Sequence, residues 1–132
     1  MSLPLKPYDQ QCIAVVHNML TKDPLINFTI EALAQEVGIN RNKLHYGFKQ
    51  LYNTTIHHYQ ERLRMKKAQF LLATTHKNIK TIAHATGYCN SSRLTAVYKK
   101  TYGTTPHQFR KQVQEFIRNN GYNKYLDGGP RQ

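Results

Sequence analysis

Residues 30–38 read IEALAQEVG, and residues 79–87 read IKTIAHATG. Both stretches begin with Ile, continue with an apolar residue followed by Ala, and end with Gly four residues after that Ala. The similarity continues at a separation of 50 residues, where TTIHHY at 54–59 runs parallel to TTPHQF at 104–109. Self-similarity at a fixed separation indicates that one structural unit is used twice.

Each unit has the pattern of a helix, a tight turn and a second helix. In the first unit, Thr29 is a suitable N-cap, Gly38 a suitable helix end, and Asn40 a suitable cap for the second helix. The expected apolar stripes are Ile30, Leu33, Ala34 and Val37 on the first helix, and Leu44, Phe48 and Leu51 on the second. A short Gly-containing turn between two helices is typical of the helix-turn-helix motif.

The second unit and the flanking segments also have helical patterns. After the repeated motif, the cap residue Asn90 precedes a stripe of Leu94, Val97 and Tyr98. Residues 59–74 contain no Gly or Pro and predict a connecting helix with a stripe of Met65, Ala68, Leu71 and Leu72. A further helix is predicted from Tyr8 to Leu20, with Ile13, Val16 and Leu20 on its buried side.

The sequence therefore predicts an all-α fold of about seven helices, in which two tandem helix-turn-helix subdomains are joined by a connecting helix. We expect the first subdomain over residues 1–58 and the connecting helix over 59–74. We expect the second subdomain over 75–116 and a flexible C-terminal tail over 117–132.

The charge of the chain indicates a polyanionic partner. Nineteen Lys and Arg stand against seven Asp and Glu, which gives a net charge of +12. Fourteen of the basic residues and only one acid, Glu61, fall within residues 37–114. Nucleic acid and an acidic membrane surface would both suit this field. No apolar run reaches the roughly 20 residues that span a bilayer, and we expect a cytoplasmic protein without a membrane partner. Cys12 and Cys89 lack C-x-x-C spacing and are expected to be structural thiols.

Several motifs, in a fixed order, resemble the DNA-binding region of the AraC family of bacterial transcription regulators. They are Leu33-Ala34-x-x-x-Gly38, Leu44-x-x-x-Phe48-Lys49, Arg64-Met65-x-x-Ala68-x-x-Leu71-Leu72, Ile82-Ala83-x-x-Thr86-Gly87-Tyr88, and Tyr98-Lys99-x-x-Tyr102-Gly103-x-x-Pro106-x-x-Phe109-Arg110. The resemblance covers residues 8–111 and implies a bilobal domain that places two recognition helices in successive major grooves of double-stranded DNA.

The resemblance also carries expectations about partners and departures from the family pattern. It implies RNA polymerase as a further partner and, in most members, a separate sensor or dimerisation domain that this sequence does not contain. The chain would then be the DNA-binding part of a longer regulator or a stand-alone member. Gly47 replaces the large apolar residue that is usual in the first recognition helix, while Thr86 and Tyr88 replace the commoner Val and Phe.

The face of each second helix opposite its apolar stripe is expected to contact DNA. The residues expected to read bases are Asn42, His45 and Tyr46 on the first, and Ser92, Arg93, Thr95 and Ala96 on the second. The residues expected to contact the sugar–phosphate backbone are Arg41, Lys43, Lys49, Ser91, Lys99, Lys100 and Arg110. The shorter side chains of the second helix predict that it positions the protein more than it specifies the sequence.

Two other functions share some of these features. A basic helical module that binds RNA or DNA without sequence preference would share the charge but would not need two similar exposed faces. An enzyme is disfavoured because the sequence has no phosphate-binding glycine motif and no paired acids in the repeat region. His57, His58 and His107 lack the Cys or carboxylate partners of a metal site, so we expect no metal and no cofactor.

Overall fold

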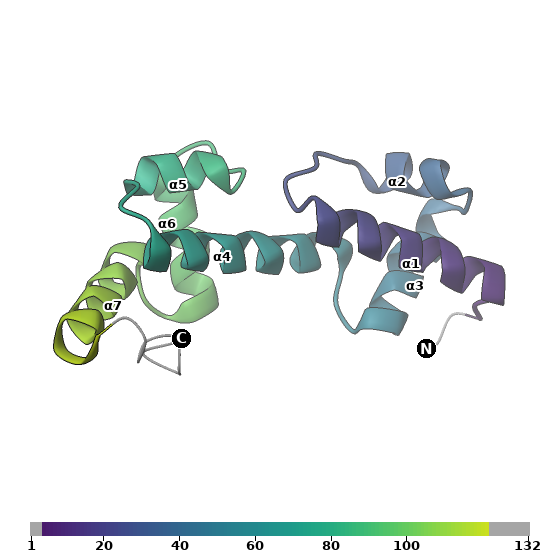
Figure 1. Ribbon diagram of the computed structural model, residues 1–132. Helices are drawn as coiled ribbons and strands as arrows, with labels where there is room; N and C mark the ends of the chain where they lie inside the picture. Colours follow the sequence, from purple (N-terminus) through teal and green to yellow (C-terminus); the bar gives the residue numbers. More distant parts are fainter. Residues whose placement is uncertain (1–3, 122–132) are drawn as a thin grey trace. The chain divides into compact units, whose positions relative to one another are not determined.

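The computed structural model describes residues 4–121, and over these residues the chain forms seven α-helices and no strand (Figure 1). The helices are α1 (Pro7–Lys22), α2 (Ile30–Val37), α3 (Arg41–Tyr52), α4 (Ile56–Thr74), α5 (Ile79–Ala85), α6 (Ser91–Tyr102) and α7 (Pro106–Asn120). The predicted all-α fold is confirmed. The connecting helix begins at Ile56, three residues earlier than predicted, and α7 continues to Asn120. The rest of the predicted tail, 122–132, lies outside the described residues.

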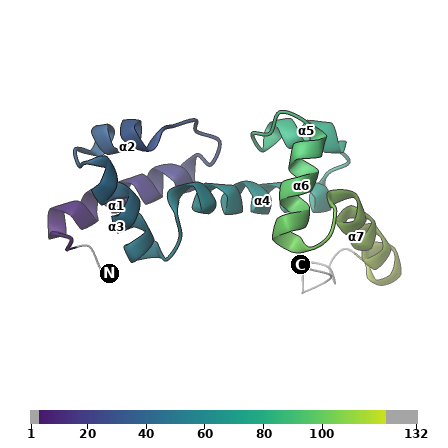
Figure 2. The same cartoon turned by 180° about the vertical axis from the view of Figure 1, so that it is seen from behind.

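The chain divides between Leu63 and Arg64 into two compact units. The first unit contains α1, α2, α3 and the start of α4, and the second contains the remainder of α4 with α5, α6 and α7. Figure 2 shows the two helix-turn-helix pairs, α2 with α3 and α5 with α6, from behind. Each unit has its own apolar core, so α4 serves as the closing helix of one and the opening helix of the other.

The core of the first unit is built around the buried face of α1. Ile13, Val16 and Leu20 are fully buried, as the helical spacing predicts. They pack with residues from the other helices of the unit, namely Ile30, Leu33, Ala34, Leu44, Phe48 and Ile56. The prediction that Leu51 belongs to this core is wrong, because its side chain is 40% exposed. The buried positions of α3 are Leu44, Gly47 and Phe48, so the buried stripe is shifted toward Gly47.

Gly47 is buried because α1 packs closely against α3 at this point. A Cβ atom at position 47 would lie 2.6 Å from Cδ1 of Ile13 and 3.2 Å from a methyl group of Leu5. The side chain that the family usually has here would occupy the space of these two residues. The departure from the family pattern is therefore matched by a local packing of α1 that needs Gly.

The core of the second unit combines side chains from four helices. The α4 residues Met65, Ala68 and Leu72 are buried as predicted, and Leu71 packs against them. The other buried members are Ile82, Ala83, Leu94, Val97, Tyr98, Phe109 and Val113. Tyr98, which is fully buried, lies with its ring centroid 4.7 Å from that of Tyr102.

The predicted N-caps are confirmed in both units. Thr29 Oγ1 accepts a hydrogen bond from the Ala32 backbone N–H at 3.0 Å, which caps α2. Asn40 Oδ1 accepts from the Lys43 N–H at 2.7 Å, and Asn90 Oδ1 accepts from the Arg93 N–H at 2.8 Å. The caps Asn40 and Asn90 fix the residues at which the second helices of the two motifs, α3 and α6, begin. Gly38 has a φ of 80°, as expected for a residue that ends a helix in the left-handed conformation.

The structure also shows an equivalence between Gln60 and Arg110, which are 50 residues apart in the sequence. Gln60 Nε2 on α4 donates to the carbonyl oxygens of Pro24 and Ile26 at 2.9 and 2.8 Å. Arg110 on α7 donates in the same way to the carbonyls of Thr75 and Lys77 in the loop before α5, and also to that of Leu72 near the end of α4. In each unit, the helix that follows the motif holds the loop that precedes it. The sequence repeat thus extends to long-range hydrogen bonds.

Candidate DNA-binding surface

The outer face of α3 carries the predicted base-reading residues of the first unit. Asn42 and Tyr46 are exposed, with 58% of Tyr46 accessible, and His45 is half-buried. The ring of His45 meets that of Tyr46 edge to face, with centroids 4.8 Å apart and an angle of 80° between the planes. Lys49 is exposed one turn further along. These four residues lie opposite the buried side of α3 and form what we call the α3 face.

Two basic residues of α3 are paired with acids of the same unit. Arg41 Nε lies 2.7 Å from Glu31 Oε1, and both side chains are more than half exposed. Lys43 Nζ lies 3.4 Å from Oδ2 of Asp9, whose side chain is only 6% exposed. A phosphate group would have to compete with these carboxylates for both cations. To contact the DNA backbone as predicted, Arg41 and Lys43 must therefore exchange these carboxylates for phosphate groups.

Asp9 links α1 to α3 and has an altered pKa. Its Oδ2 accepts a hydrogen bond from the Lys6 backbone N–H at 3.0 Å. This bond, with a smaller contribution from Lys43, holds the pKa of Asp9 below its ordinary value. For Glu31, a hydrogen bond from its own backbone N–H and then the one from Arg41 lower the pKa. Both acids therefore stay ionised to a lower pH than free carboxylates do.

The outer face of α6 carries the corresponding residues of the second unit. Ser92, Arg93, Ala96, Lys99 and Lys100 are exposed, and Ser91 and Thr95 are half-buried. The turn before α6 is packed against Arg64 of α4. The Arg64 guanidinium lies 6.0 Å from the ring centroid of Tyr88. A Cβ atom at Gly87 would lie 3.1 Å from Cζ of Arg64. Arg64 therefore packs on the helix-turn-helix turn.

Arg110 has a structural role that the sequence did not predict. Its Nε donates to the carbonyl oxygen of Leu72 at 3.1 Å, one terminal nitrogen donates to that of Thr75 at 3.2 Å, and the other donates to that of Lys77. Burial lowers the pKa of Arg110 from its ordinary value. The acceptors are Leu72 near the end of α4 and Thr75 and Lys77 in the loop before α5, so Arg110 has a structural role in addition to the predicted contact with phosphate.

Comparison with known proteins identifies the family. Residues 33–112 match the model of a helix-turn-helix domain family. The arabinose operon regulatory protein of Escherichia coli (strain K12) is 30% identical over 91 residues, which are 69% of this chain and 31% of that protein. A transcriptional regulator of Chromobacterium violaceum with an AraC-type DNA-binding domain has the same fold, with a TM-score of 0.70 and 25% identity over 82% of this chain and 96% of that one. The chain belongs to the AraC-type helix-turn-helix family.

The AraC-type domain is a sequence-specific DNA-binding domain of transcription regulators. The DNA-binding domain of the transcriptional factor AdpA, solved in complex with a target DNA, shares its fold at a TM-score of 0.70 and 19% identity, over 82% of this chain and 95% of that one. The chain spans 31% of the length of the arabinose regulator. Family membership favours sequence-specific DNA binding over the alternative of a non-specific basic module.

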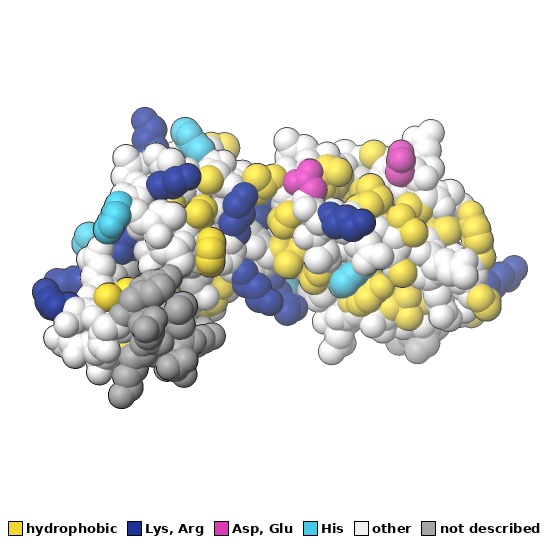
Figure 3. All heavy atoms as spheres, in the orientation of Figure 1, with side chains coloured by type: hydrophobic (Ala, Val, Ile, Leu, Met, Phe, Trp, Pro, Cys, Tyr) yellow, Lys and Arg dark blue, Asp and Glu magenta, His cyan; other side chains and the backbone are white. Residues whose placement is uncertain are grey.

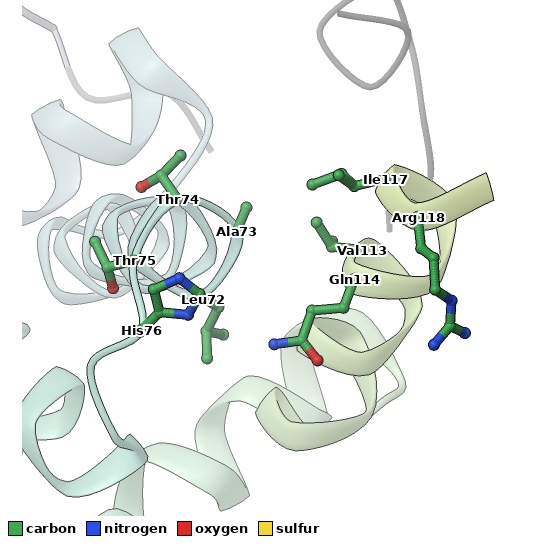
Figure 4. A pocket seen from close by; sticks show the side chains of 9 residues that line it. All are labelled: Leu72, Ala73, Thr74, Thr75, His76, Val113, Gln114, Ile117 and Arg118. Carbon is green, nitrogen blue, oxygen red and sulfur yellow. The ribbon is translucent and has the colours of Figure 1, made fainter. Parts of the chain in front are cut away.

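Other features of the AraC-type domain lie away from the recognition helices. A cavity of about 380 Å³ in the second unit lies between the end of α4 and α7 (Figure 4). Its walls include Leu72, Val113 and Ile117, with His76 and Arg118 at its edge. Within residues 4–121, none of the helices has an apolar stretch of the length that a membrane span requires. The same residues contain no cluster of His, Cys, Asp or Glu that could hold a metal ion.

The two cysteines differ in their surroundings. Cys12 is buried in the first unit, which agrees with the structural role expected from the sequence. Cys89 is exposed, so its thiol is not part of the core. Its backbone carbonyl oxygen lies 3.1 Å from Nε2 of His84, across the turn between α5 and α6. For Cys89 the backbone, rather than the thiol, has the structural contact.

Proposed function

We propose that this AraC-type domain regulates transcription from bacterial promoters by inserting α3 and α6 into successive major grooves, with the α3 face as the main reader of sequence. The observation that carries the proposal is the composition of that face. Three side chains with hydrogen-bonding groups, Asn42, His45 and Tyr46, lie on the exposed side of a helix whose opposite side is fixed in the core. A recognition helix needs such an arrangement, because base edges must meet donors and acceptors held on a rigid element.

Each residue of the α3 face has a contact suited to its chemistry. The Asn42 amide can bond to N6 and N7 of an adenine at once. The edge-to-face contact limits the movement of the His45 and Tyr46 rings, so that their polar atoms are held ready for base edges. Lys49, which is longer and lies further along α3, suits a phosphate oxygen.

The outer face of α6 supports the proposal with shorter side chains. Arg93 suits a guanine or a phosphate, and Thr95 and Ala96 suit the methyl group of thymine. Ser91 and Ser92 lie in the first turn of α6, where hydroxyl and backbone N–H groups suit phosphate oxygens. Lys99 and Lys100 in its last turns would contact the backbone, together with Arg41 and Lys43 of α3.

The cellular setting is part of the same proposal. A domain that regulates promoters acts in the bacterial cytoplasm, because the promoter DNA is there. RNA polymerase is then its protein partner. A sensor or dimerisation domain would belong to a longer regulator of which this domain is a part. The proposal includes no cofactor and no catalytic step.

Selection of bound duplexes from a random pool, followed by sequencing, tests the proposal. We expect a defined site, bound about 10³-fold or more tightly than a random duplex of equal length at the same salt concentration. Equal affinity for the selected and random duplexes would support the non-specific module instead. Because phosphate contacts dominate binding at low salt, the comparison should be made near 150 mM salt.

A further inference from the structure

The two units differ sharply in charge. The first unit, Met1–Leu63, has six Lys and Arg and five Asp and Glu, a net charge of +1. The second, Arg64–Gln132, has thirteen Lys and Arg and two Asp and Glu, a net charge of +11. Nearly all of the net charge of +12 therefore belongs to one half of a repeated fold.

The acids of the first unit lie beside the cations of its recognition helix. Two ion pairs described in this unit, Arg41 with Glu31 and Lys43 with Asp9, involve the cations at the beginning of α3, where a recognition helix approaches DNA. On the face drawn in Figure 3, the magenta acidic side chains lie over the first unit, whereas dark blue Lys and Arg side chains gather mainly over the second unit and α4. The two units therefore have similar folds but very different surface charge.

Charge has a specific consequence for binding to DNA of arbitrary sequence. Non-specific affinity comes almost entirely from cations that neutralise phosphates and release counterions. A unit with a net charge of +11 gains this affinity on any duplex, whereas a unit whose acids balance its cations gains little. The first unit must therefore obtain its binding free energy from contacts with matching bases.

We infer that the second unit supplies the sequence-independent grip on DNA, and that the first unit engages the duplex only where its bases match, with Glu31 restraining Arg41 until then. This division of roles rests on the proposed function, since it assigns a part of the DNA contact to each unit. Glu31 is a positioning residue in this scheme. It holds Arg41 away from the phosphates of a non-matching site.

The equivalent residues Lys49 and Lys99 provide a matched test in the full chain. Both are exposed and lie at the same position of the repeat. With a random duplex, Lys99→Gln should make the slope of log affinity against log salt about 0.9 shallower, whereas Lys49→Gln should leave it unchanged. With the selected duplex, both changes should make the slope shallower. Equal changes in the random-duplex slope for the two variants would overturn the inference.

Glu31→Gln tests the restraint, with Glu36→Gln as its control. Both acids are exposed on α2, so the change in charge is the same, but the described ion pair with Arg41 belongs to Glu31. Glu31→Gln should raise affinity for a random duplex several-fold and lower the ratio of selected to random affinity, and Glu36→Gln should do so much less. The same rise for both variants would show that Glu31 acts only through its net charge, against the proposed restraint.

Failure of this inference is distinguishable from failure of the proposed function. If the wild-type chain prefers no sequence, the proposed function fails. The random-duplex slopes of Lys49→Gln and Lys99→Gln still report which unit grips DNA. Thermal unfolding of each variant, monitored by circular dichroism, confirms that the exposed substitutions leave the fold intact.

Discussion

Gly47 of α3 lies so close to Ile13 of α1 that a Cβ atom at position 47 would be 2.6 Å from Ile13 Cδ1. Ile13 is fully buried and has little room to move. Gly within a helix costs about 1 kcal/mol relative to Ala. The close approach of the two helices explains why the sequence tolerates this cost in a recognition helix.

This contact predicts non-additive effects in a double-mutant cycle. Gly47→Ala should destabilise the fold by up to about 2 kcal/mol, because overpacking costs roughly 1 to 3 kcal/mol and helix propensity returns about 1. Ile13→Val removes Cδ1 and alone should cost about 0.5 to 1.5 kcal/mol. The double variant should be about 1 kcal/mol more stable than the sum of both effects, as measured by urea unfolding. Strictly additive costs would contradict the packing explanation.

Arg110→Ala tests the structural role of Arg110 and should destabilise the fold. Loss of its hydrogen bonds to the carbonyls of Leu72, Thr75 and Lys77 should lower the free energy of unfolding by about 1.5 to 3 kcal/mol. Its exposed neighbour Lys111 provides a control with the same change in charge, and Lys111→Ala should stay within about 0.5 kcal/mol. Unchanged stability of Arg110→Ala, together with a salt slope about 0.9 shallower on DNA, would contradict the structural role and leave the phosphate contact alone.

The lowered pKa of Asp9 predicts a dependence of stability on pH. A carboxylate with a lowered pKa in the folded state stabilises that state above its unfolded pKa of about 3.9. This contribution is lost as the pH falls through the lower, folded value. Asp9→Asn should therefore reduce the melting temperature at pH 7, and the difference from the wild type should shrink below about pH 4. A difference that stays constant down to pH 2 would exclude the ionised carboxylate as its cause.

Asn42→Ala and Tyr46→Ala should change sequence preference. Each should cost about 1 to 3 kcal/mol on the selected duplex and relax the preference at one or two base pairs, because a bidentate or aromatic contact with a base edge is lost. Both residues are exposed, so the melting temperature should change little. Selection repeated with each variant gives the measurement. An unchanged preference at every position for Asn42→Ala would remove this residue from the readers.

The features predicted correctly from the sequence are those that leave a local pattern. The caps Thr29, Asn40 and Asn90 precede helices directly, and the buried sides of α1 and of the second half of α4 follow helical spacing. The internal repeat then fixed the order of the two motifs. Cap residues and helical periodicity in the sequence therefore predicted the helices and most of both cores.

The errors concern contacts between distant parts of the chain. Leu51 fits the apolar spacing of α3 but is exposed, because the tight contact with α1 falls on Gly47. The ties made by Gln60 and Arg110 join residues more than 30 positions apart and leave no local pattern. Gln60 and Arg110 are nevertheless 50 residues apart, which is the separation of the sequence repeat. Alignment of the two units position by position would have placed Gln60 beside Arg110.

The shared helix α4 has a consequence for how the chain folds. It is 19 residues long, and its first turns carry Ile56 into one core while Met65 and Leu72 join the other. Half of such a helix is too short to persist alone in water. If either core melts, the adjoining half of α4 loses its packing and unfolds. The unfolding of that half then destabilises the other half of α4, which belongs to the other unit. Heating should therefore give one cooperative transition for both units, and the amide protons of α4 should exchange only when the whole chain opens.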